Sequence, residues 1–411
     1  MNYAEHIQHR LFRTIGEIAD KNGQRAFAIG GFTRDLLLGR PSKDVDIVVE
    51  GSGIALAEEA ASSLRAGRVS VFRNFGTAMF RLGDLEVEFV GARRESYERG
   101  SRKPVVENGT IEDDQRRRDF TINALAISLN GRTFGDLVDP FHGVTDLRSG
   151  RIRTPLDPDI TYSDDPLRML RAIRFAAQLG FQITDANLAS ITRNSERLEI
   201  ISSERIHAEL NKIILSDQPS VGFKLLYKTR LLHQFFPEMV ALQGVEWRNG
   251  IGHKDNFYHT LEVLDNVAET SDDLWLRWAA ILHDIAKPPT KRFHPQQGWT
   301  FHGHEDRGAR MVPKIFKRLK LPLDGKMKYV QKLVLLHLRP IALTKNQITD
   351  SAVRRLLFEA GDDIDDLMVL CKADITSKNE AKVKRYLKNY DVVIKKLKAV
   401  DVNDQIRNFQ P

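Results

Sequence analysis

The segment AFAIGGFTRDLLLGRPSKDVDIVVE, residues 26–50, constrains the fold of this chain more than any other. Its last part is rich in β-branched residues, predicts a strand over 44–49, and contains Asp44 and Asp46. Residues two apart in a strand point to the same side, so both carboxylates should face one spot. Because Asp is depleted from strand interiors, the pair favours a divalent metal site, with a solvated edge strand as the alternative.

A pair of glycines lies between a strand predicted over 26–29 and a short helix predicted over 33–38. Gly30 and Gly31 let the backbone approach a ligand closely, and the first N–H groups of the helix favour an anion such as a triphosphate. The P-loop and dinucleotide-binding motifs that compete for this interpretation do not occur in the sequence. The order strand, Gly-Gly, helix, strand therefore predicts a phosphate-binding turn beside a metal site.

A basic triplet, Arg116 to Arg118, precedes the sequence DFTINA and is expected to open a helix that docks on the sheet. A guanidinium group there would reach a triphosphate with bidentate geometry. A solvated basic surface is the simpler alternative.

The sequence DDPLR at residues 164–168 places Pro166 in the first turn of a predicted helix, with acids at its N-terminus. Asp165 and Arg168 are three apart and should share a helical face, so that an acceptor lies beside a donor. Cytosine and adenine each present an amino donor beside a ring-nitrogen acceptor and would pair with this arrangement. Uracil and guanine present the reverse pattern and would leave buried groups unpaired, at about 1–3 kcal/mol each. Ordinary N-capping is the alternative.

Together these motifs resemble the class II tRNA nucleotidyltransferases, or CCA-adding enzymes, and their bacterial poly(A) polymerase relatives in the polymerase-β superfamily. The resemblance implies template-independent addition of CMP and AMP, from CTP and ATP, to the 3′ ends of tRNA. It implies that Asp44 and Asp46 bind two Mg²⁺ ions and that a third acid completes the catalytic set. Glu88, in an alternating strand predicted over 85–90, fits that place best, and Glu86 on the same face is the alternative.

The resemblance also implies a nucleotide-binding set drawn from all of these motifs. Its members are Gly30, Gly31, Arg34, Arg117, Arg118, Asn123, Asp165, Arg168, Arg171 and Arg174. The family motif EDxxR departs here in its first acid, which is Asp164. Residues 91–115 are polar and predict a loop, which the family links to addition of the terminal adenosine.

A second set of ligand-type residues, His259, the dyad His283-Asp284, and Asp374, recurs at wide spacing in helical context. Adjacent His and Asp at the end of an apolar helix are unusual, so the set predicts a metal site. The order resembles the HD phosphohydrolase domain, and the resemblance implies phosphomonoesters or 2′,3′-cyclic phosphates on nucleotides or damaged RNA ends as substrates. Imidazole with carboxylate suits Mn²⁺, Ni²⁺, Fe²⁺ or Zn²⁺ better than Mg²⁺ alone. Further possible ligands, which would allow a second metal, are His302, His304 and His337, and Lys287 follows the dyad.

The expected fold class is α+β, with three domains. Residues 1–150 form a nucleotidyltransferase head with a mixed sheet and helices, 151–243 an all-α neck or body, and 244–411 an all-α HD domain. The strands are predicted at 26–29, 44–49, 69–73, 78–82 and 85–90, and helical periodicity dominates from about residue 160.

Composition limits the partners and the compartment. A net charge of +7 and a pI of about 9.3 are compatible with a nucleic-acid partner, here tRNA and not DNA. The basic run at 382–398 is either a solvated helix face or an RNA-binding patch. One cysteine, Cys371, excludes an internal disulfide and fits a reducing cytoplasm. No apolar run reaches the roughly 18 residues of a membrane span, so no membrane partner is expected. The oligomeric state is left open, and the chain is suspected to continue past Pro411.

Two other functions fit the same residues. One is a related enzyme restricted to A addition or poly(A) synthesis. The other, of a different class, is an HD phosphohydrolase whose head only binds nucleotide or RNA.

Overall fold

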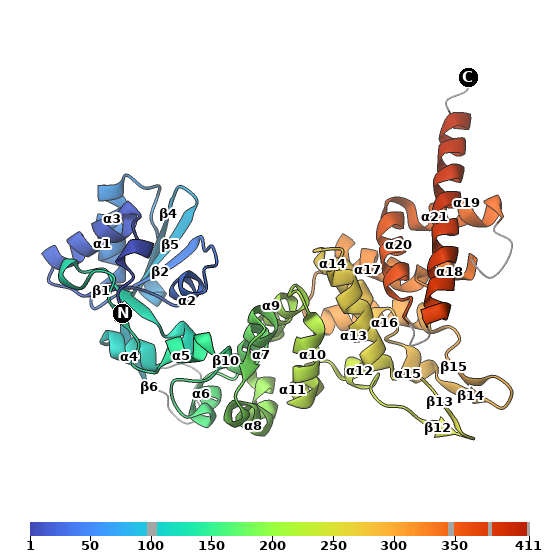
Figure 1. The fold of residues 1–411 in the computed structure, drawn as a ribbon, viewed down its shortest axis with the longest axis horizontal. Coiled ribbons are helices and arrows are strands. Elements are labelled where there is room, and N and C mark those ends of the chain that lie inside the picture. The colour runs from blue at the N-terminus through green and yellow to red at the C-terminus, as the bar shows by residue number, and fades with distance from the viewer. Residues whose placement is uncertain (97–104, 344–348, 377–379, 409–411) are drawn as a thin grey trace. The chain divides into compact units, whose positions relative to one another are not determined.

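The structure is a computed structural model that describes residues 1–96, 105–343, 349–376 and 380–408. It divides into two compact units, Met1–Asn194 and Ser195–Pro411. The first unit contains a seven-stranded mixed sheet with helices, and the second is almost wholly helical (Figure 1). The predicted α+β fold class is confirmed, while the division into three domains at residues 150 and 243 stays a prediction.

The sheet of the first unit has the strand order β3-β4-β5-β2-β1-β8-β9. The central strands β2 and β5 run parallel and the other neighbours antiparallel. All five predicted strands form, and the two that were not predicted are only two or three residues long. The strands are β1 Ala26–Ile29, β2 Asp44–Val49, β3 Ser70–Phe72, β4 Thr77–Leu82, β5 Leu85–Gly91, β8 Ala126–Ser128 and β9 Leu137–Val138.

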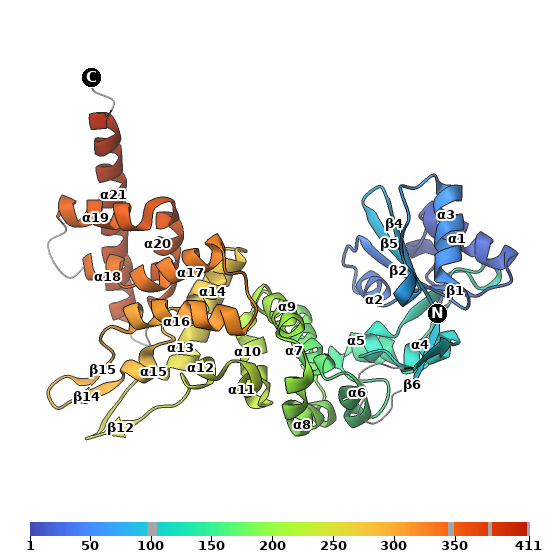
Figure 2. The same ribbon diagram turned by 180° about the vertical axis from the view of Figure 1, so that it is seen from behind.

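The two faces of this sheet are covered to different extents. Helices α1 (Arg10–Lys21) and α3 (Gly53–Leu64) cover one face, where Val45, Ile47 and Val49 of β2 join the main core (Figures 1 and 2). Side chains alternate along a strand, so the acids of β2 point to the opposite face. That face has only a small core cluster around Val48, so it stays open beside the acids.

The segment after β5 was predicted as a loop, and that prediction is wrong for the residues that the structure describes. Strands β6 (Arg93–Ser96) and β7 (Val105–Asn108) form a hairpin, and α4 (Ile111–Arg116) follows, while residues 97–104 lie outside the described part. Thr110 and Asp113 make a capping box that starts α4. The basic triplet therefore ends a helix instead of opening one.

The other elements of the first unit surround the sheet and extend it. The helices are α2 Gly31–Leu37, α5 Gly143–Arg148, α6 Pro158–Asp164, α7 Leu167–Leu179 and α8 Asp185–Asn194. Short 3₁₀ turns lie at Ala4–His6, Arg73–Phe75, Thr121–Asn123 and Gly131–Thr133, and β10 (Arg151–Ile152) pairs with β11 (Gln182–Ile183).

The second unit is a set of packed helices with two small antiparallel hairpins. The hairpins are β12 (Trp247–Arg248) with β13 (Ile251–Gly252), and β14 (Arg292–His294) with β15 (Gly298–Thr300). The helices are α9 Ser203–Ile214, α10 Pro219–Lys228, α11 Leu231–Phe235, α12 Pro237–Val240, α13 Asn256–Ala268, α14 Leu274–Leu282, α15 Lys287–Thr290, α16 His304–Arg318, α17 Gly325–Leu336, α18 Arg339–Leu343, α19 Asp350–Ala360, α20 Ile364–Ala373 and α21 Glu380–Asn408, with 3₁₀ turns at Ser195–Ile200 and Gly361–Asp363. Among the described residues, none of these helices combines the length and apolarity needed to cross a bilayer.

Candidate active site and metal centre

The open face of the sheet carries four acids in register on β2 and β5. Asp44 lies opposite Glu86, and Asp46 lies opposite Glu88. Burial raises the pKa of Asp46, and the neighbouring Asp44 carboxylate raises it further, while Arg118 acts in the opposite sense. Burial and the charge of Asp46 likewise raise the pKa of Glu88. The strands thus concentrate negative charge at one spot.

This cluster fits a divalent cation. Burial first, and neighbouring carboxylates second, raise the pKa values of Asp46 and Glu88, and a bound cation would favour the charged form of both acids. An all-oxygen set of carboxylates suits Mg²⁺. Glu86 accepts a hydrogen bond of 2.9 Å from the Arg81 guanidinium, whereas Glu88 lies directly beside Asp46. The register supports Glu88 as the third acid, and its role stays a prediction.

The glycine pair lies against this cluster. Gly30 has a φ of 77° and precedes α2, a conformation that favours glycine. A Cβ added there would lie 2.9 Å from Oδ2 of Asp46 and 3.1 Å from Nη1 of Arg118. Only glycine therefore lets the turn approach both the acid and the arginine. The structure brings the predicted phosphate turn and metal acids together.

Two arginines of the basic triplet are held by an acid that the sequence analysis did not single out. Asp114 is fully buried in α4, and its carboxylate accepts from Arg117 at 2.5 Å and from Arg118 at 3.0 Å. The signal was present, because spacings of three and four residues place these groups on one helical face. Asp114 orients both guanidinium groups, and that of Arg118 lies beside Gly30 and Asp46.

A second buried acid, Asp119, organises another part of the predicted set. Its carboxylate accepts from the Arg171 guanidinium at 2.6 Å and from Nδ2 of Asn123 at 3.1 Å. Oδ1 of Asn123 in turn accepts from Arg34 at 2.9 Å. Burial raises the pKa of Asp119, but the charge of Arg171 and the hydrogen bond from Asn123 outweigh it and lower the pKa overall. Asp119 is the first residue of the DFTINA motif, and the sequence alone assigned it no role.

Three of the predicted arginines gather around one aromatic ring. The guanidinium carbons of Arg34, Arg171 and Arg174 lie 5.0, 5.6 and 4.1 Å from the centroid of Phe175. Cations over a ring face are attracted by its quadrupole. Phe175 on α7 therefore fixes α7 arginines next to the arginine of α2, a role that residue spacing alone did not reveal.

The Asp165–Arg168 pair departs from its predicted geometry. Asp165 has φ −137° and ψ 98° and lies between α6 and α7, so the two residues do not share a helical face. The reason is Pro166, since a residue before proline is pushed from the helical to the extended region. Oδ1 of Asp165 accepts from the Leu167 backbone N–H at 3.2 Å, and Arg168 donates to the Arg117 carbonyl at 2.6 Å.

A cavity of about 200 Å³ joins the triplet to the α6–α7 junction. Arg117 and Arg168 from the predicted set both line it. Asp164, the acid at which this sequence departs from the family motif EDxxR, lines it as well. Its full lining is Arg94, Asp113, Arg116, Arg117, Leu156, Ile160, Thr161, Asp164 and Arg168. Four arginines give it a positive character that suits a nucleotide or an RNA end.

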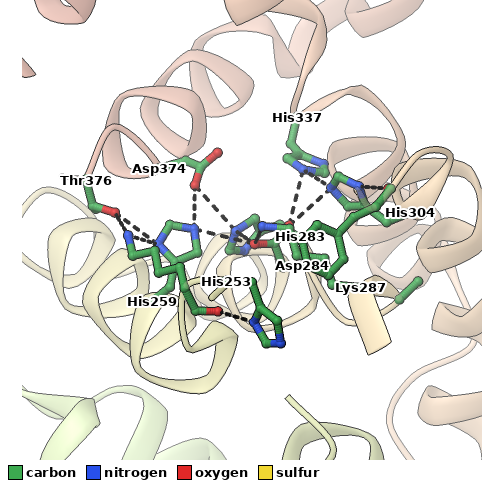
Figure 3. A network of polar contacts seen from close by, with 12 residues as sticks. His253, His259, His283, Asp284, Lys287, His304, His337, Asp374 and Thr376 are labelled. Carbon is green, nitrogen blue, oxygen red and sulfur yellow. Dashed lines mark hydrogen bonds and ion pairs between the residues drawn. The ribbon is translucent and has the colours of Figure 1, made fainter. Parts of the chain in front are cut away.

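The second unit buries two groups of metal-ligand side chains that share Asp284 (Figure 3). Oδ2 of Asp284 lies 3.2 Å from Nε2 of His283 and 3.4 Å from Nε2 of His259. Its Oδ1 lies 3.2 Å from Nε2 of His304 and 3.9 Å from Nε2 of His337. One carboxylate thus faces two imidazole pairs, and its two oxygens would be available to two metal ions.

Asp374 completes the first group. Its Oδ1 lies 2.9 Å from Nε2 of His259 and 3.6 Å from Nε2 of His283 (Figure 3). The structure therefore assembles the six predicted ligands from segments more than a hundred residues apart. His302 is exposed and belongs to neither group.

Hydrogen bonds show that these histidines fit a metal. In His283, His304 and His337, Nδ1 lies 2.7 Å from the carbonyl oxygen three residues earlier. A carbonyl only accepts, so each Nδ1 carries a proton and each Nε2 faces the cluster as the atom that a metal would bind. Nε2 of His283 is buried and makes no hydrogen bond within the described residues. That orphaned atom is what a metal ion would satisfy.

The charges in the cluster point the same way. Burial lowers the pKa of His283, yet the carboxylates of Asp284 and Asp374 overcome it and raise the pKa to about 10. Burial and the charge of His283 lower the pKa of His337 to about 4. The positive charge that the two carboxylates draw onto His283 is the charge that a bound cation would supply.

Two ammonium groups flank the cluster. Nζ of Lys287 donates to Oδ2 of Asp284 at 2.5 Å, and Nζ of Lys254 lies 2.9 Å from Nδ1 of His259. Oγ1 of Thr376 lies 2.9 Å from the same nitrogen of His259. Sequence analysis missed Lys254 and Thr376, which carry no local signal. Cations around a metal centre suit an anionic substrate.

Comparison with protein-family models divides the chain into three matched regions. Residues 26–153 match the Poly A polymerase head domain. Residues 180–242 match the model described as "Probable RNA and SrmB- binding site of polymerase A". Residues 256–379 match the HD domain.

Similar proteins and structures agree with these matches. The multifunctional CCA protein of Pseudoalteromonas atlantica is 35% identical over 316 residues, covering 73% of this chain and 72% of that protein. The A-adding tRNA nucleotidyltransferase of Aquifex aeolicus is 32% identical over 358 residues, covering 79% of this chain and 42% of that protein. A tRNA nucleotidyltransferase crystallised with a primer tRNA and an incoming ATP analogue has a TM-score of 0.64 at 26% identity, covering 92% of this chain and 99% of its own. This chain therefore belongs to the CCA-adding tRNA nucleotidyltransferase family and carries an HD domain.

Proposed function

We propose that this protein is a CCA-adding enzyme, which transfers CMP and AMP from CTP and ATP to the 3′ end of tRNA without a nucleic-acid template. The observation that carries the proposal is the parallel register that sets Asp46 beside Glu88, with the Gly30 turn and Arg118 packed against Asp46. Solved structures similar to this chain include a tRNA nucleotidyltransferase with a primer tRNA and an incoming ATP analogue, and a tRNA-processing enzyme with CTP.

In the proposed reaction, the 3′-hydroxyl of the RNA attacks the α-phosphate, and the bond to the β-phosphate breaks to release pyrophosphate. The family depends on divalent metal, and we assign Mg²⁺ to Asp44, Asp46 and Glu88, where it would neutralise charge on the phosphates and activate the hydroxyl. Arg117 and Arg118 bind the triphosphate in the orientation that Asp114 gives them.

Base choice is assigned to Asp165 and Arg168 at the α6–α7 junction. The carboxylate accepts from the amino group of C or A, and the guanidinium donates to the adjacent ring nitrogen. Both side chains already hydrogen-bond within the protein, to the Leu167 N–H and the Arg117 carbonyl, so the base competes for groups held in place. Changing both to Ala should relax discrimination against UTP by about a hundredfold. The variant lacks the two polar groups that uracil would leave unpaired, so UTP no longer carries their cost.

The activity test uses tRNA ending at the discriminator base, at C, or at CC, with Mg²⁺ and one labelled NTP at a time. Incorporation of CTP onto the first two acceptors and of ATP onto the third is expected. No extension of the first acceptor with CTP would refute the CCA assignment. If the double Ala variant still rejected UTP as well as the parent, the base-pairing role of Asp165 and Arg168 would be wrong.

A second candidate within the same chemistry is addition of A alone. The relative from Aquifex aeolicus, 32% identical, carries that name. The same assay separates the two, because an A-adding or poly(A) enzyme would extend only the CC acceptor, or extend it repeatedly.

We further propose that the HD region is a phosphohydrolase for phosphomonoesters or 2′,3′-cyclic phosphates. The sharing of Asp284 by two buried ligand groups, with Lys254 and Lys287 at their rim, supports this. Mixed imidazole and carboxylate ligands favour Mn²⁺, Ni²⁺, Fe²⁺ or Zn²⁺ over Mg²⁺. Hydrolysis of p-nitrophenyl phosphate with each metal, beside the metal content of the protein, tests it. Metal-loaded protein without hydrolysis of any phosphate ester would refute it.

The alternative from another class, in which the head only binds nucleotide or RNA, predicts hydrolysis without any nucleotide incorporation. The buried Cys371 thiol fits a reducing compartment, and we place the enzyme in the cytoplasm.

A further inference from the structure

The two small hairpins of the second unit pack on each other and form one surface. Nε1 of Trp299 donates to the Ile251 carbonyl at 3.0 Å, and the Arg248 guanidinium lies 5.0 Å from the Phe293 ring. Phe293 and Trp299 face each other across β14–β15. Arg248 and Ile251, paired across β12–β13, thus form the side that packs on the second hairpin.

Trp247 lies on the other side of β12–β13, and 73% of it is exposed. Its cross-strand partner is Gly252, where an added Cβ would lie 3.0 Å from three separate atoms of the indole. Contact with three ring atoms at one distance means that the flat face of the indole rests on the glycine. The opposite face is open to solvent. Such a rigidly seated aromatic face is what a nucleobase stacks on.

Basic side chains lie on the other sides of the two hairpins. Arg248 and Arg292 are exposed, and Lys291 lies 5.5 Å from the Trp299 ring. Lys291 also pairs with Glu246, the nearby acid of the first hairpin. The positive charge of this region attracts an RNA strand, and the stacking contact itself falls to Trp247.

This surface leads directly to the metal cluster. His253 follows Gly252, and its ring packs edge-on against Trp299 and Phe301. Lys254 comes next, and its Nζ contacts Nδ1 of His259 in the cluster. Two residues of chain span at most about 7 Å, so the seat of the indole and the rim of the metal centre are close neighbours.

We infer that Trp247, seated on Gly252, is a binding platform for the end of a single-stranded RNA whose terminal phosphate enters the HD metal centre. The inference rests on the proposed phosphohydrolase function and names the side chain that would hold an RNA substrate beside it. A small phosphomonoester fills the metal centre without touching the platform, whereas an RNA end uses both.

The test compares two substrates on the metal-loaded full chain: an oligoribonucleotide of about eight nucleotides with a 3′-phosphate, and p-nitrophenyl phosphate. Trp247→Ala should lower kcat/KM for the oligonucleotide about tenfold, with p-nitrophenyl phosphate unchanged within about twofold. Gly252→Ala should act in the same direction, because a Cβ there displaces the indole. Trp247→Phe, which keeps a stacking face, should restore part of the loss.

The matched control is Phe358→Ala, which removes another exposed aromatic side chain, 89% accessible, on α19. It should alter neither substrate. Equal kcat/KM of Trp247→Ala and the parent on the oligonucleotide would overturn the inference. So would an equal loss on both substrates, which would assign Trp247 to the shape of the metal centre, or a dimer in solution that Trp247→Ala dissociates.

Binding is also measured without catalysis, which separates the two proposals. A 4-thiouridine-containing oligonucleotide is photocrosslinked to the metal-free full chain, and the peptides are mapped. Crosslinks in 244–256 and 291–303 are expected. They would support RNA binding at Trp247 even if no phosphate ester were hydrolysed. Crosslinks confined to the first unit would overturn it.

Discussion

The carboxylate cluster of the first unit and the histidine cluster of the second are two metal-type sites built on opposite principles. The first takes Asp44, Asp46 and Glu88 from two adjacent strands, uses oxygen only, and lies on an open sheet face. The second collects six groups from distant helices, of which five are buried and Asp374 is partly exposed. An open oxygen site accepts bulky phosphates that bring part of the metal coordination, whereas a buried site of imidazoles and carboxylates would supply most of the metal ligands from the protein.

The electrostatics of the two sites differ in the same sense. In the open site, burial and then the neighbouring carboxylates raise the pKa values of Asp46 and Glu88. In the closed site, the carboxylates raise the pKa of His283 instead. Each cluster is balanced only with added positive charge. Because the two sites lie in separate units, removal of an acid from one site should abolish the activity of that site and leave the other activity intact.

The largest effect is expected from Asp46→Asn. Removing this charge should reduce nucleotide incorporation by at least about 1,000-fold, since metal stabilisation of the reacting phosphates is worth several kcal/mol. Hydrolysis of p-nitrophenyl phosphate should be unchanged. Single-turnover extension of tRNA ending at CC measures the loss. Asp84→Asn, at an exposed carboxylate that pairs with Lys43, is the control and should extend normally.

Asp284→Asn should produce the converse result. Loss of the carboxylate shared by both ligand groups should lower phosphate-ester hydrolysis by at least about 100-fold and reduce bound metal, with tRNA extension intact. Hydrolysis assays and elemental analysis of the purified protein check both. His302→Ala removes an exposed histidine outside the cluster and should retain both properties. Full metal content in Asp284→Asn would contradict the bridging role.

The choice between the two acids of β5 gives a sharper and smaller test. Glu88→Gln should lower incorporation at least about tenfold, because Glu88 lies beside Asp46. Glu86→Gln should have little effect, because that carboxylate pairs with Arg81. The Mg²⁺ dependence of the rate is the readout, and the reverse order of the two variants would make Glu86 the third acid.

The smallest effect concerns the support behind the open site. Asp119→Asn weakens the contact with Arg171 and should destabilise α7 locally by about 1–3 kcal/mol. The folded pKa of Asp119 is lowered from 3.8, so its contribution is present above that value and is lost as the pH falls through the folded pKa. Hydrogen exchange of the α7 amides should therefore differ between variant and parent at pH 7 and converge below about pH 4. A difference that persisted in acid would exclude the charge of Asp119 as its source.

Local patterns predicted most of the first site. The alternation of Asp44 and Asp46 with Val45 and Ile47 follows from the two-residue period of a strand, which neighbouring residues alone determine. The errors there were also local in origin. The capping box at Thr110 and the effect of Pro166 on Asp165 both depend on residues close by in the sequence. The first sets the start of α4, and the second separates α6 from α7.

The partners of these residues followed no local pattern. Asp119 meets Arg171, and Phe175 collects Arg34 with Arg171 and Arg174, across separations that only packing brings together. The same holds for Lys254 and Thr376 beside His259.

The sequence by itself determined the fold class, the identity of the metal-type acids and histidines, and the family, because periodicity, special residues and motifs are properties of contiguous chain. Only the tertiary structure decided that Glu88 stands beside Asp46, that Asp284 is shared by two ligand groups, and that Trp247 rests on Gly252 next to the metal centre. These are distances between residues far apart in the chain or across a turn, and they are set by how helices and strands pack, which no local pattern encodes.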